Sequence, residues 1–333
     1  MQYQQAIAQL KDGQAKQYIL FYGEDEFLKA AGVRQAVDLL DVQTPELNVS
    51  YFEERPDAGD VARAMETLPF MSDKRVIVIR NTDILSSACA AEYTGSLDAA
   101  VMPPGNYLVI GIKGKLDKRK KFYKKIEQQG MVVDCAPLNE KQLADFVTGE
   151  VSQRNLMITE KNARLLGELC GGDLQVVINE VEKLAAVSKG NITQQDIEKY
   201  VSKSLEYNVF KIHDNFCSRN EAAAKVLIDR LLEEEPNPVS LISLLAGNFK
   251  QMLVARACKD AGFSERKTIM HIMEETGAKE WSAKRAIGNC KSFSAQKLRH
   301  SIYRLGQIDF DAKQGGVVLQ TDLFALLVGI YNR

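Results

Sequence analysis

The stretch "FYGEDEFLKAAG", residues 21–32, decides the fold of the N-terminal part of this chain. It follows the apolar run 18–22 and precedes a helical pattern. A phosphate-binding loop lies between a strand and a helix in this order, and its sequence pattern is G-x-x-x-x-G-K-[ST]. In such a loop the glycines let backbone N–H groups surround the phosphates, while the lysine and the hydroxyl contact the outer phosphates and magnesium. The stretch therefore raises the question of a nucleotide site.

The residues at the required positions match this pattern only in part. Gly23 and Lys29 keep the spacing, but Leu28 replaces the second glycine and Ala30 replaces the hydroxyl residue. The acidic E-D-E segment after Gly23 places carboxylates where a nucleotide would bring its own negative charges, so the like charges would repel. Acidic residues are favourable at a helix N-terminus, which explains them without a ligand. We expect this degenerate loop to bind no nucleotide.

Composition narrows the class of protein. The 333 residues are enough for two or three domains, and a net charge of −1 argues against a chain that binds nucleic acid over its whole surface. The six cysteines form no C-x-x-C pair and the three histidines are isolated, so we expect reduced thiols, no metal and no other cofactor. The start of the chain does not resemble a signal peptide, and no apolar run is long enough to span a membrane. We expect a cytoplasmic protein.

The first 138 residues alternate short apolar runs with helical stretches. Nearly continuous apolar strands separated by helices are typical of a parallel sheet that is covered on both faces. The strand signal stops after Pro137, and we place a domain boundary there. The expected strands are residues 18–22, 48–52, 75–80, 107–112 and 131–135.

The rest of the chain has a helical pattern. Gly171 and Gly172 are a helix stop, Asp173 can cap the next helix, and Thr193 with Asp196 starts a short one. Two longer helices are expected at 220–235, ended by the segment Pro236-Asn237-Pro238, and at 239–262. We therefore predict an α/β domain followed by all-α domains, with boundaries at residues 1–138, 139–207 and 208–333.

Two stretches have two interpretations each. In "KGKLDKRKKFYKK", residues 113–125, basic residues flank Phe122 and Tyr123 on both sides, which suits binding to a nucleic-acid backbone. The alternative is an amphipathic helix whose aromatic side chains pack on the sheet. In "TLPFMSDKR", residues 67–75, a proline forces a turn whose apolar side chains either enter the core or project toward a partner protein.

The other candidate positions do not indicate a catalytic site. The expected strand 75–80 ends in Arg80-Asn81, where an active P-loop ATPase needs an acidic residue to hold magnesium. Trp281, the single tryptophan, lies among cations in "AKEWSAKR", so it either stacks on a base or packs in the core. We find no G-x-S-x-G or H-E-x-x-H motif and no clustered acidic pair in a loop context that suits catalysis.

Over nearly its full length the chain resembles the delta subunits of bacterial DNA polymerase III clamp loaders. The resemblance rests on the order and spacing of several stretches rather than on one strict signature. These are "FYGEDEFLKAAG", "TLPFMSDKRVIVI", "DKRKKFYKKI", "GGDLQVVINEVEKL", "YNVFKIHD", "EEEPNPVSLISLLAGNFKQML" and "DFDAKQG".

The resemblance implies an AAA+-like α/β domain with a degenerate P-loop, a small helical lid domain and a helical C-terminal collar domain. It implies a non-catalytic subunit that binds and opens the beta sliding clamp without hydrolysing ATP. Its partners would be the sliding clamp, the gamma/tau and delta-prime type loader subunits, and primer-template DNA. Active AAA+ lids often carry an arginine after G-D-x, and this chain has Gln175 there.

The resemblance also implies roles for particular residues. The clamp-binding residues would be Phe70 and Met71, with Leu68 beside them; the family often has P-L-F or P-F-F here, so Met71 departs mildly. Two other functions stay open: an active AAA+ ATPase with an unusual P-loop, and a free-standing nucleic-acid-binding protein. The candidate DNA contacts are Lys118, Arg119, Lys121 and Trp281.

Overall fold

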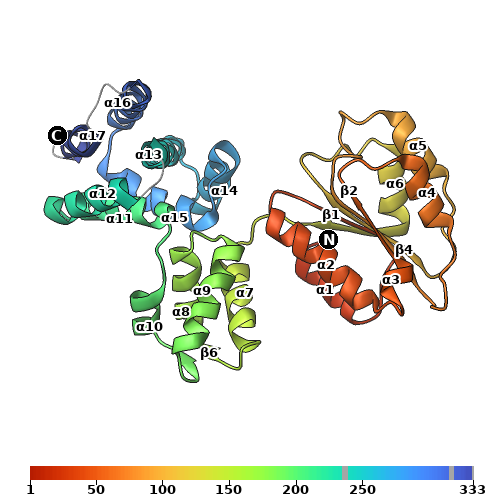
Figure 1. The fold of residues 1–333 in the computed structure, drawn as a ribbon. Helices are drawn as coiled ribbons and strands as arrows, with labels where there is room; N and C mark the ends of the chain where they lie inside the picture. The colour runs from red at the N-terminus through yellow and green to blue at the C-terminus, as the bar shows by residue number, and fades with distance from the viewer. Residues whose placement is uncertain (235–238, 315–318, 332–333) are drawn as a thin grey trace. The chain divides into compact units, whose positions relative to one another are not determined.

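The computed structural model describes residues 1–234, 239–314 and 319–331. The chain divides into two compact units, Met1–Pro137 and Leu138–Arg333 (Figure 1). The helix stop expected at residues 236–238 lies outside the described residues.

The first unit is built on a five-stranded parallel sheet with the strand order β2-β3-β4-β1-β5. The side chains of its central strands are almost all buried, as their apolar sequences predict. All five expected strands are present, each within two residues of its predicted ends. They are β1 (Tyr18–Tyr22), β2 (Val49–Glu53), β3 (Arg75–Thr82), β4 (Asn106–Ile112) and β5 (Gly130–Asp134).

Helices cover both faces of this sheet (Figure 1). On one face lie α1 (Tyr3–Lys11) and α2 (Glu26–Leu40), and α2 approaches β1 so closely that a Cβ on Gly32 would lie 2.5 Å from the ring of Phe21. The other face carries the larger apolar core of this unit. Its helices are α4 (Ala58–Glu66), α5 (Ala91–Ala99) and α6 (Lys121–Gln129), while the short α3 (Pro45–Asn48) leads into β2.

The second unit begins with short helices. Asp173 caps α9 (Leu174–Val187), and Thr193 forms a capping box with Asp196 at the start of α10 (Gln194–Tyr200), so both predicted helix starts are confirmed. The expectation that no strand follows Pro137 is wrong, because β6 (Met157–Ile158) pairs in parallel with β7 (Asn191–Ile192). Strands of this length are too short to produce an apolar run. The helices are α7 (Glu140–Ser152), α8 (Glu160–Leu169), α9 (Leu174–Val187) and α10 (Gln194–Tyr200).

The remaining helices share one large apolar core, to which the long helix α13 (Val239–Asp260) contributes along much of its length. Ser204 caps α11, so the boundary that the sequence places between residues 207 and 208 falls inside this helix; the division into three domains stays a prediction. No described helix is both long and apolar enough to cross a membrane. The elements are α11 (Leu205–Cys217), α12 (Glu221–Glu234), α13 (Val239–Asp260), α14 (Glu265–Thr276), α15 (Glu280–Asn289), η1 (Cys290–Ser292), α16 (Ala295–Lys313) and α17 (Leu319–Tyr331).

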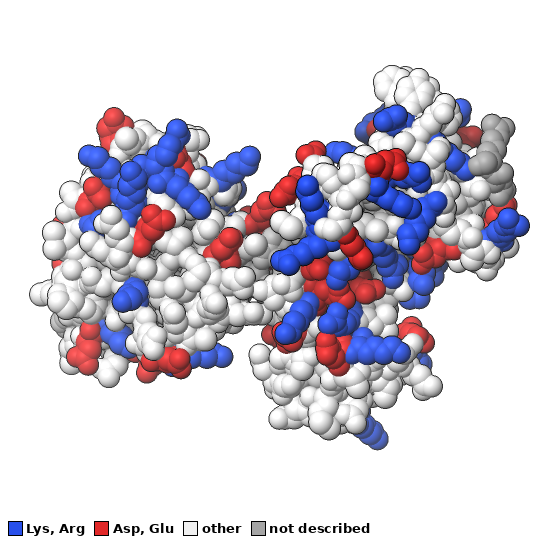
Figure 2. Space-filling model, turned by 180° about the vertical axis from the view of Figure 1, so that it is seen from behind, with Lys and Arg blue, Asp and Glu red and all other residues white. Residues whose placement is uncertain are grey.

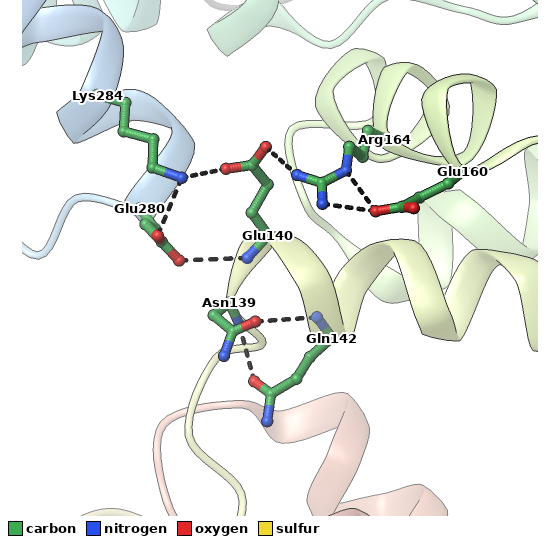
Figure 3. Close-up of polar contacts among 7 residues, drawn as sticks. All are labelled: Asn139, Glu140, Gln142, Glu160, Arg164, Glu280 and Lys284. Carbon is green, nitrogen blue, oxygen red and sulfur yellow. Dashed lines mark hydrogen bonds and ion pairs between the residues drawn. The ribbon is translucent and has the colours of Figure 1, made fainter.

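A set of ion pairs joins the early and late helices of the second unit (Figure 3). Glu140, at the start of α7, accepts a hydrogen bond of 2.6 Å from Arg164 of α8 and another from Lys284 of α15. Lys284 also pairs with Glu280 on its own helix. The hydrogen bond from Lys284 is the main reason why the pKa of Glu140 lies below its ordinary value. The two predicted helical domains are therefore in direct contact at this point.

Candidate protein-interaction site

The turn that connects α4 to β3, residues 67–74, exposes three large apolar side chains. Helix α4 ends at Glu66, and Pro69 prevents its continuation because proline restricts the preceding residue and has no N–H to donate. Leu68, Phe70 and Met71 are 67%, 57% and 80% exposed. Of the two interpretations left open by the sequence, projection into solvent is the one that the structure shows.

The turn is ordered although its side chains are exposed. The carboxamide of Asn48, at the end of α3, hydrogen bonds to both backbone groups of Phe70, at 2.8 Å to the N–H and 2.9 Å to the carbonyl oxygen. Lys74 donates from Nζ to the carbonyl oxygen of Leu40 at 2.7 Å. The backbone of Met71 is in the left-handed region, with φ of 49°. These contacts hold a conformation that a non-glycine residue rarely adopts.

Gly105 and Asn106, at the point where β4 begins, contact both ends of the turn. Asn106, which is fully buried, donates from Nδ2 to the carbonyl oxygens of Met65 and Thr67 at 2.8 and 2.9 Å. A Cβ on Gly105 would lie 2.4 Å from the carbonyl oxygen of Asp73, so this approach requires glycine. Phe70 and Met71 thus project from a segment whose two ends are attached to the sheet.

Several backbone N–H groups of the phosphate-loop region are already hydrogen bonded within the protein. The N–H of Asp25 donates to the carbonyl oxygen of Cys135 at 3.0 Å, and the N–H of Leu28 donates to the Asp25 side chain at 2.9 Å. Asp25 is the N-cap of α2, and the N–H of Lys29 bonds to its carbonyl oxygen. Leu28 itself is buried in the core. In an active loop such N–H groups would bind phosphates.

Gly23 has a structural reason to be glycine. Its φ is 133°, and a Cβ there would lie 2.6 Å from the carbonyl carbon of Cys135, the residue after β5. Glycine is therefore required by the close approach of two backbone segments. Burial raises the pKa of the Cys135 thiol to about 12, so this cysteine is not a reactive thiolate.

Lys29 and the end of β3 border a cavity of about 390 Å³ beside α2. The Lys29 side chain is buried, and its Nζ pairs with Glu26 at 2.6 Å. Arg80 pairs with Glu53, and its guanidinium lies 5.0 Å from the ring centroid of Tyr51. Both cations are thus already paired with carboxylates of this chain. Asn81, also in the cavity wall, has a φ of 51°.

The basic stretch 113–125 combines a buried apolar side with an exposed basic side. Phe122 and Tyr123 are buried in the core, so these aromatic rings are not available to stack on bases. Lys118, Arg119 and Lys121 are exposed, but Arg119 already makes a two-bond contact with Asp117. Figure 2 shows Lys and Arg side chains gathered near the top of the first unit, at the left of the view.

Trp281 is a core residue of the second unit. It is 6% exposed, and its ring lies 5.1 Å from that of Phe210, centroid to centroid. The ring therefore packs in the core, which is the second of the two interpretations that the sequence left open, and the structure does not support base stacking by Trp281. Gln175, at the start of α9, hydrogen bonds to Asn179 on its own helix at 3.2 Å.

Within the described residues no three His, Cys, Asp or Glu side chains come together as a possible metal site. All six cysteines are free thiols, and Cys217 is the exposed one. His213 is completely buried and hydrogen bonds to the hydroxyl of Tyr331.

Comparisons with known proteins agree over most of the chain. The family model "DNA polymerase III, delta subunit" matches residues 18–136, and "DNA polymerase III delta subunit, C-terminal domain" matches residues 206–328. The DNA polymerase III subunit delta of Bacillus subtilis is 25% identical over 337 residues, which cover 97% of this chain and 95% of that protein.

The solved structure of the Bacillus subtilis DNA clamp loader delta protein has a similar fold. It gives a TM-score of 0.71 at 23% identity, covering 99% of this chain and 100% of its own. The predicted fold class, a parallel-sheet α/β domain followed by helices, is confirmed. The two family models cover the sheet of the first unit and most of the helices that follow α10. The chain belongs to the DNA polymerase III delta subunit family.

Proposed function

We propose that this protein is the clamp loader subunit that binds the beta sliding clamp and opens it for loading onto primed DNA. The observation that carries the proposal is the exposed turn, where Leu68, Phe70 and Met71 project from an ordered backbone. Aromatic residues and methionine are enriched in the centres of protein interfaces, where each fills a pocket of the partner. Methionine can adapt to an irregular pocket, so Met71 suits this role.

Opening a ring requires that the turn bind one state of the clamp more tightly than another. A ligand shifts an equilibrium only by the difference between its affinities for the two states. The turn would therefore bind more tightly to a clamp whose subunit interface is already distorted. A turn that is ordered before binding favours this mechanism, since less binding energy is then used to order the loop.

We propose further that this subunit does not hydrolyse ATP. In the loop after β1 the N–H groups of Asp25 and Leu28 are already bonded within the protein, and Gly23 faces the backbone of Cys135. The alternative, an active ATPase, predicts saturable binding of Mg-ATP to the isolated chain, which calorimetry would detect. ATP would act through the gamma/tau type subunits of the loader, and the helices of the second unit would contact the other subunits.

The deciding experiment is binding of the isolated protein to the sliding clamp of the same organism, without nucleotide. We expect the double variant Phe70→Ala/Met71→Ala to lose about 2 kcal/mol or more of binding free energy, a factor of about 30 in Kd. Both side chains are exposed, so the variant should keep the unfolding temperature of the wild type.

A matched control is Phe310→Ala/Met157→Ala, because these side chains are 61% and 66% exposed in the second unit. The control should bind the clamp like the wild type. If both double variants bind equally well, the turn is not the clamp site. If the wild type does not bind, the proposal is wrong.

Primer-template DNA is a proposed partner as well. The exposed cations that could contact its backbone are Lys118 and Lys121, with Arg119 beside them. A loader that encircles DNA would use such side chains for contacts with phosphates, which carry no sequence information.

A further inference from the structure

We propose that Asn48 is a positioning residue for clamp binding: its side-chain amide fixes the backbone of Phe70 and so presents Phe70 and Met71 to the clamp. This inference rests on the proposed function. Asn48 lies 22 positions before Phe70 in the sequence and is completely buried, so it does not itself face a partner. Its effect on binding would act through the turn.

The hydrogen bonds at Asn48 have the chemistry that this role requires. Oδ1 accepts from the N–H of Phe70 at 2.8 Å, and Nδ2 donates to the carbonyl oxygen of Phe70 at 2.9 Å. A primary amide carries a donor and an acceptor side by side, so it can pair with both groups of one residue as a neighbouring strand would. The N–H of Phe70 requires the amide oxygen and the carbonyl oxygen of Phe70 requires the amide nitrogen, so only one orientation of the Asn48 amide makes both hydrogen bonds. Aspartate at this position would lack the donor.

The amide is itself held from the other side. Nδ2 also lies 3.1 Å from the carbonyl oxygen of Gln43 and 3.0 Å from the hydroxyl oxygen of Thr44, at the start of α3. Asn48 therefore connects the loop before β2 to the turn before β3. The strands β2 and β3 are neighbours in the sheet, so this connection is made at the sheet end from which the turn projects.

The conformation next to this contact would not persist without support. Met71 has a φ of 49°, which is unfavourable for a residue with a side chain. Without the hydrogen bonds of Asn48, the turn would sample conformations that do not place Phe70 and Met71 together. The apparent Kd for a partner rises in proportion as the competent conformation becomes less populated.

The test compares Asn48→Ala with Asn162→Ala in clamp binding, at a temperature where both variants are folded. Asn162 is a suitable control because it too is a buried asparagine whose Nδ2 bonds to backbone, at 3.2 Å from the carbonyl oxygen of Ile192 in the second unit. We expect Asn48→Ala to weaken clamp binding about 10-fold or more and Asn162→Ala to change it less than about 2-fold. Equal affinity of folded Asn48→Ala and wild type would overturn the inference.

The same inference predicts amide hydrogen exchange in the unaltered protein, which does not depend on whether a variant folds. The N–H of Phe70 should exchange much more slowly than that of an unbonded exposed residue, because it is bonded to a buried amide. Exchange at the unprotected rate would show that Asn48 does not order the turn.

The two proposals fail in different ways. If Phe70→Ala/Met71→Ala abolishes clamp binding but folded Asn48→Ala binds normally, the clamp function stands and the positioning role is wrong. If the wild type does not bind the clamp, both are wrong, whatever the exchange rate of Phe70.

Discussion

Acidification should destabilise the second unit through one buried histidine, His213 of α11. Its ring is completely buried, its Nδ1 pairs with the hydroxyl of Tyr331 from α17, and its Nε2 has no partner among the described residues. The ring of Phe249 lies 5.0 Å away, centroid to centroid. Burial in these surroundings lowers the pKa of His213 from 6.5 to about 3.

The sign of the effect follows from proton uptake. Below pH 6.5 the unfolded chain binds a proton at this histidine and the folded chain does not, so stability falls as the pH falls. Above pH 6.5 His213 costs the folded state no stability. As the pH falls from 6.5 toward about 3, the free energy of unfolding decreases, and below about pH 3 this histidine changes it no further. Between pH 7 and pH 5 the loss is about 2 kcal/mol, from 1.5 pH units at about 1.4 kcal/mol each.

The measurement is urea unfolding at pH 7 and pH 5, followed by tryptophan fluorescence. Trp281 is the single tryptophan and packs on Phe210 of α11, so its signal reports on this part of the second unit. Because carboxylates titrate in the same range, the informative quantity is the difference between the wild type and His213→Gln, which cannot titrate. We expect the pH-dependent loss in His213→Gln to be smaller by about 2 kcal/mol.

The matched control is His300→Gln, since His300 is exposed on α16. This variant should keep the pH dependence of the wild type. An identical pH dependence in His213→Gln and the wild type would refute the reasoning, because His213 would then titrate alike in the folded and unfolded chains.

Two further outcomes are expected in the first unit. Gly23→Ala should lower the free energy of unfolding by about 2 kcal/mol or more, because the added Cβ would lie 2.6 Å from the backbone of Cys135. The control Gly114→Ala, where nothing lies within 4 Å of the added Cβ, should lower it by about 1 kcal/mol. Equal losses in the two variants would contradict this reasoning. Replacing Lys118, Arg119 and Lys121 by glutamate should reduce the salt dependence of loader binding to primer-template DNA, unlike glutamate at Lys161, Lys189 and Lys203. An unchanged salt dependence would remove these three side chains from the DNA interface.

Much of the fold could be predicted because local patterns carried the information. The strands of the sheet are apolar runs, and a buried parallel strand is apolar on both faces, so the pattern has few competing explanations. Asp173 and Thr193 start helices through contacts within a few residues, which the sequence displays directly. The pair β6 and β7 escaped prediction because two residues per strand produce no periodic pattern.

The candidate site was predictable only in part. Pro69 and the apolar residues around it identify a turn, but they do not tell whether Phe70 faces the core or the solvent. Asn48 gave a weak signal: it stood at the start of an expected strand, where asparagine is disfavoured, and this could have marked it as a residue with another task. Its partner is far along the chain, so no local pattern reveals the contact.

By itself, the sequence determined the order of strands and helices and the loss of the second glycine and the hydroxyl residue from the loop after β1, because these depend on neighbouring residues. Only the tertiary structure decided that Phe70 and Met71 are exposed, that Trp281 is buried, and that Gly23 faces the backbone of Cys135. These outcomes depend on which distant segments pack together. Burial and close approach are properties of the packed chain, and local sequence patterns do not encode them.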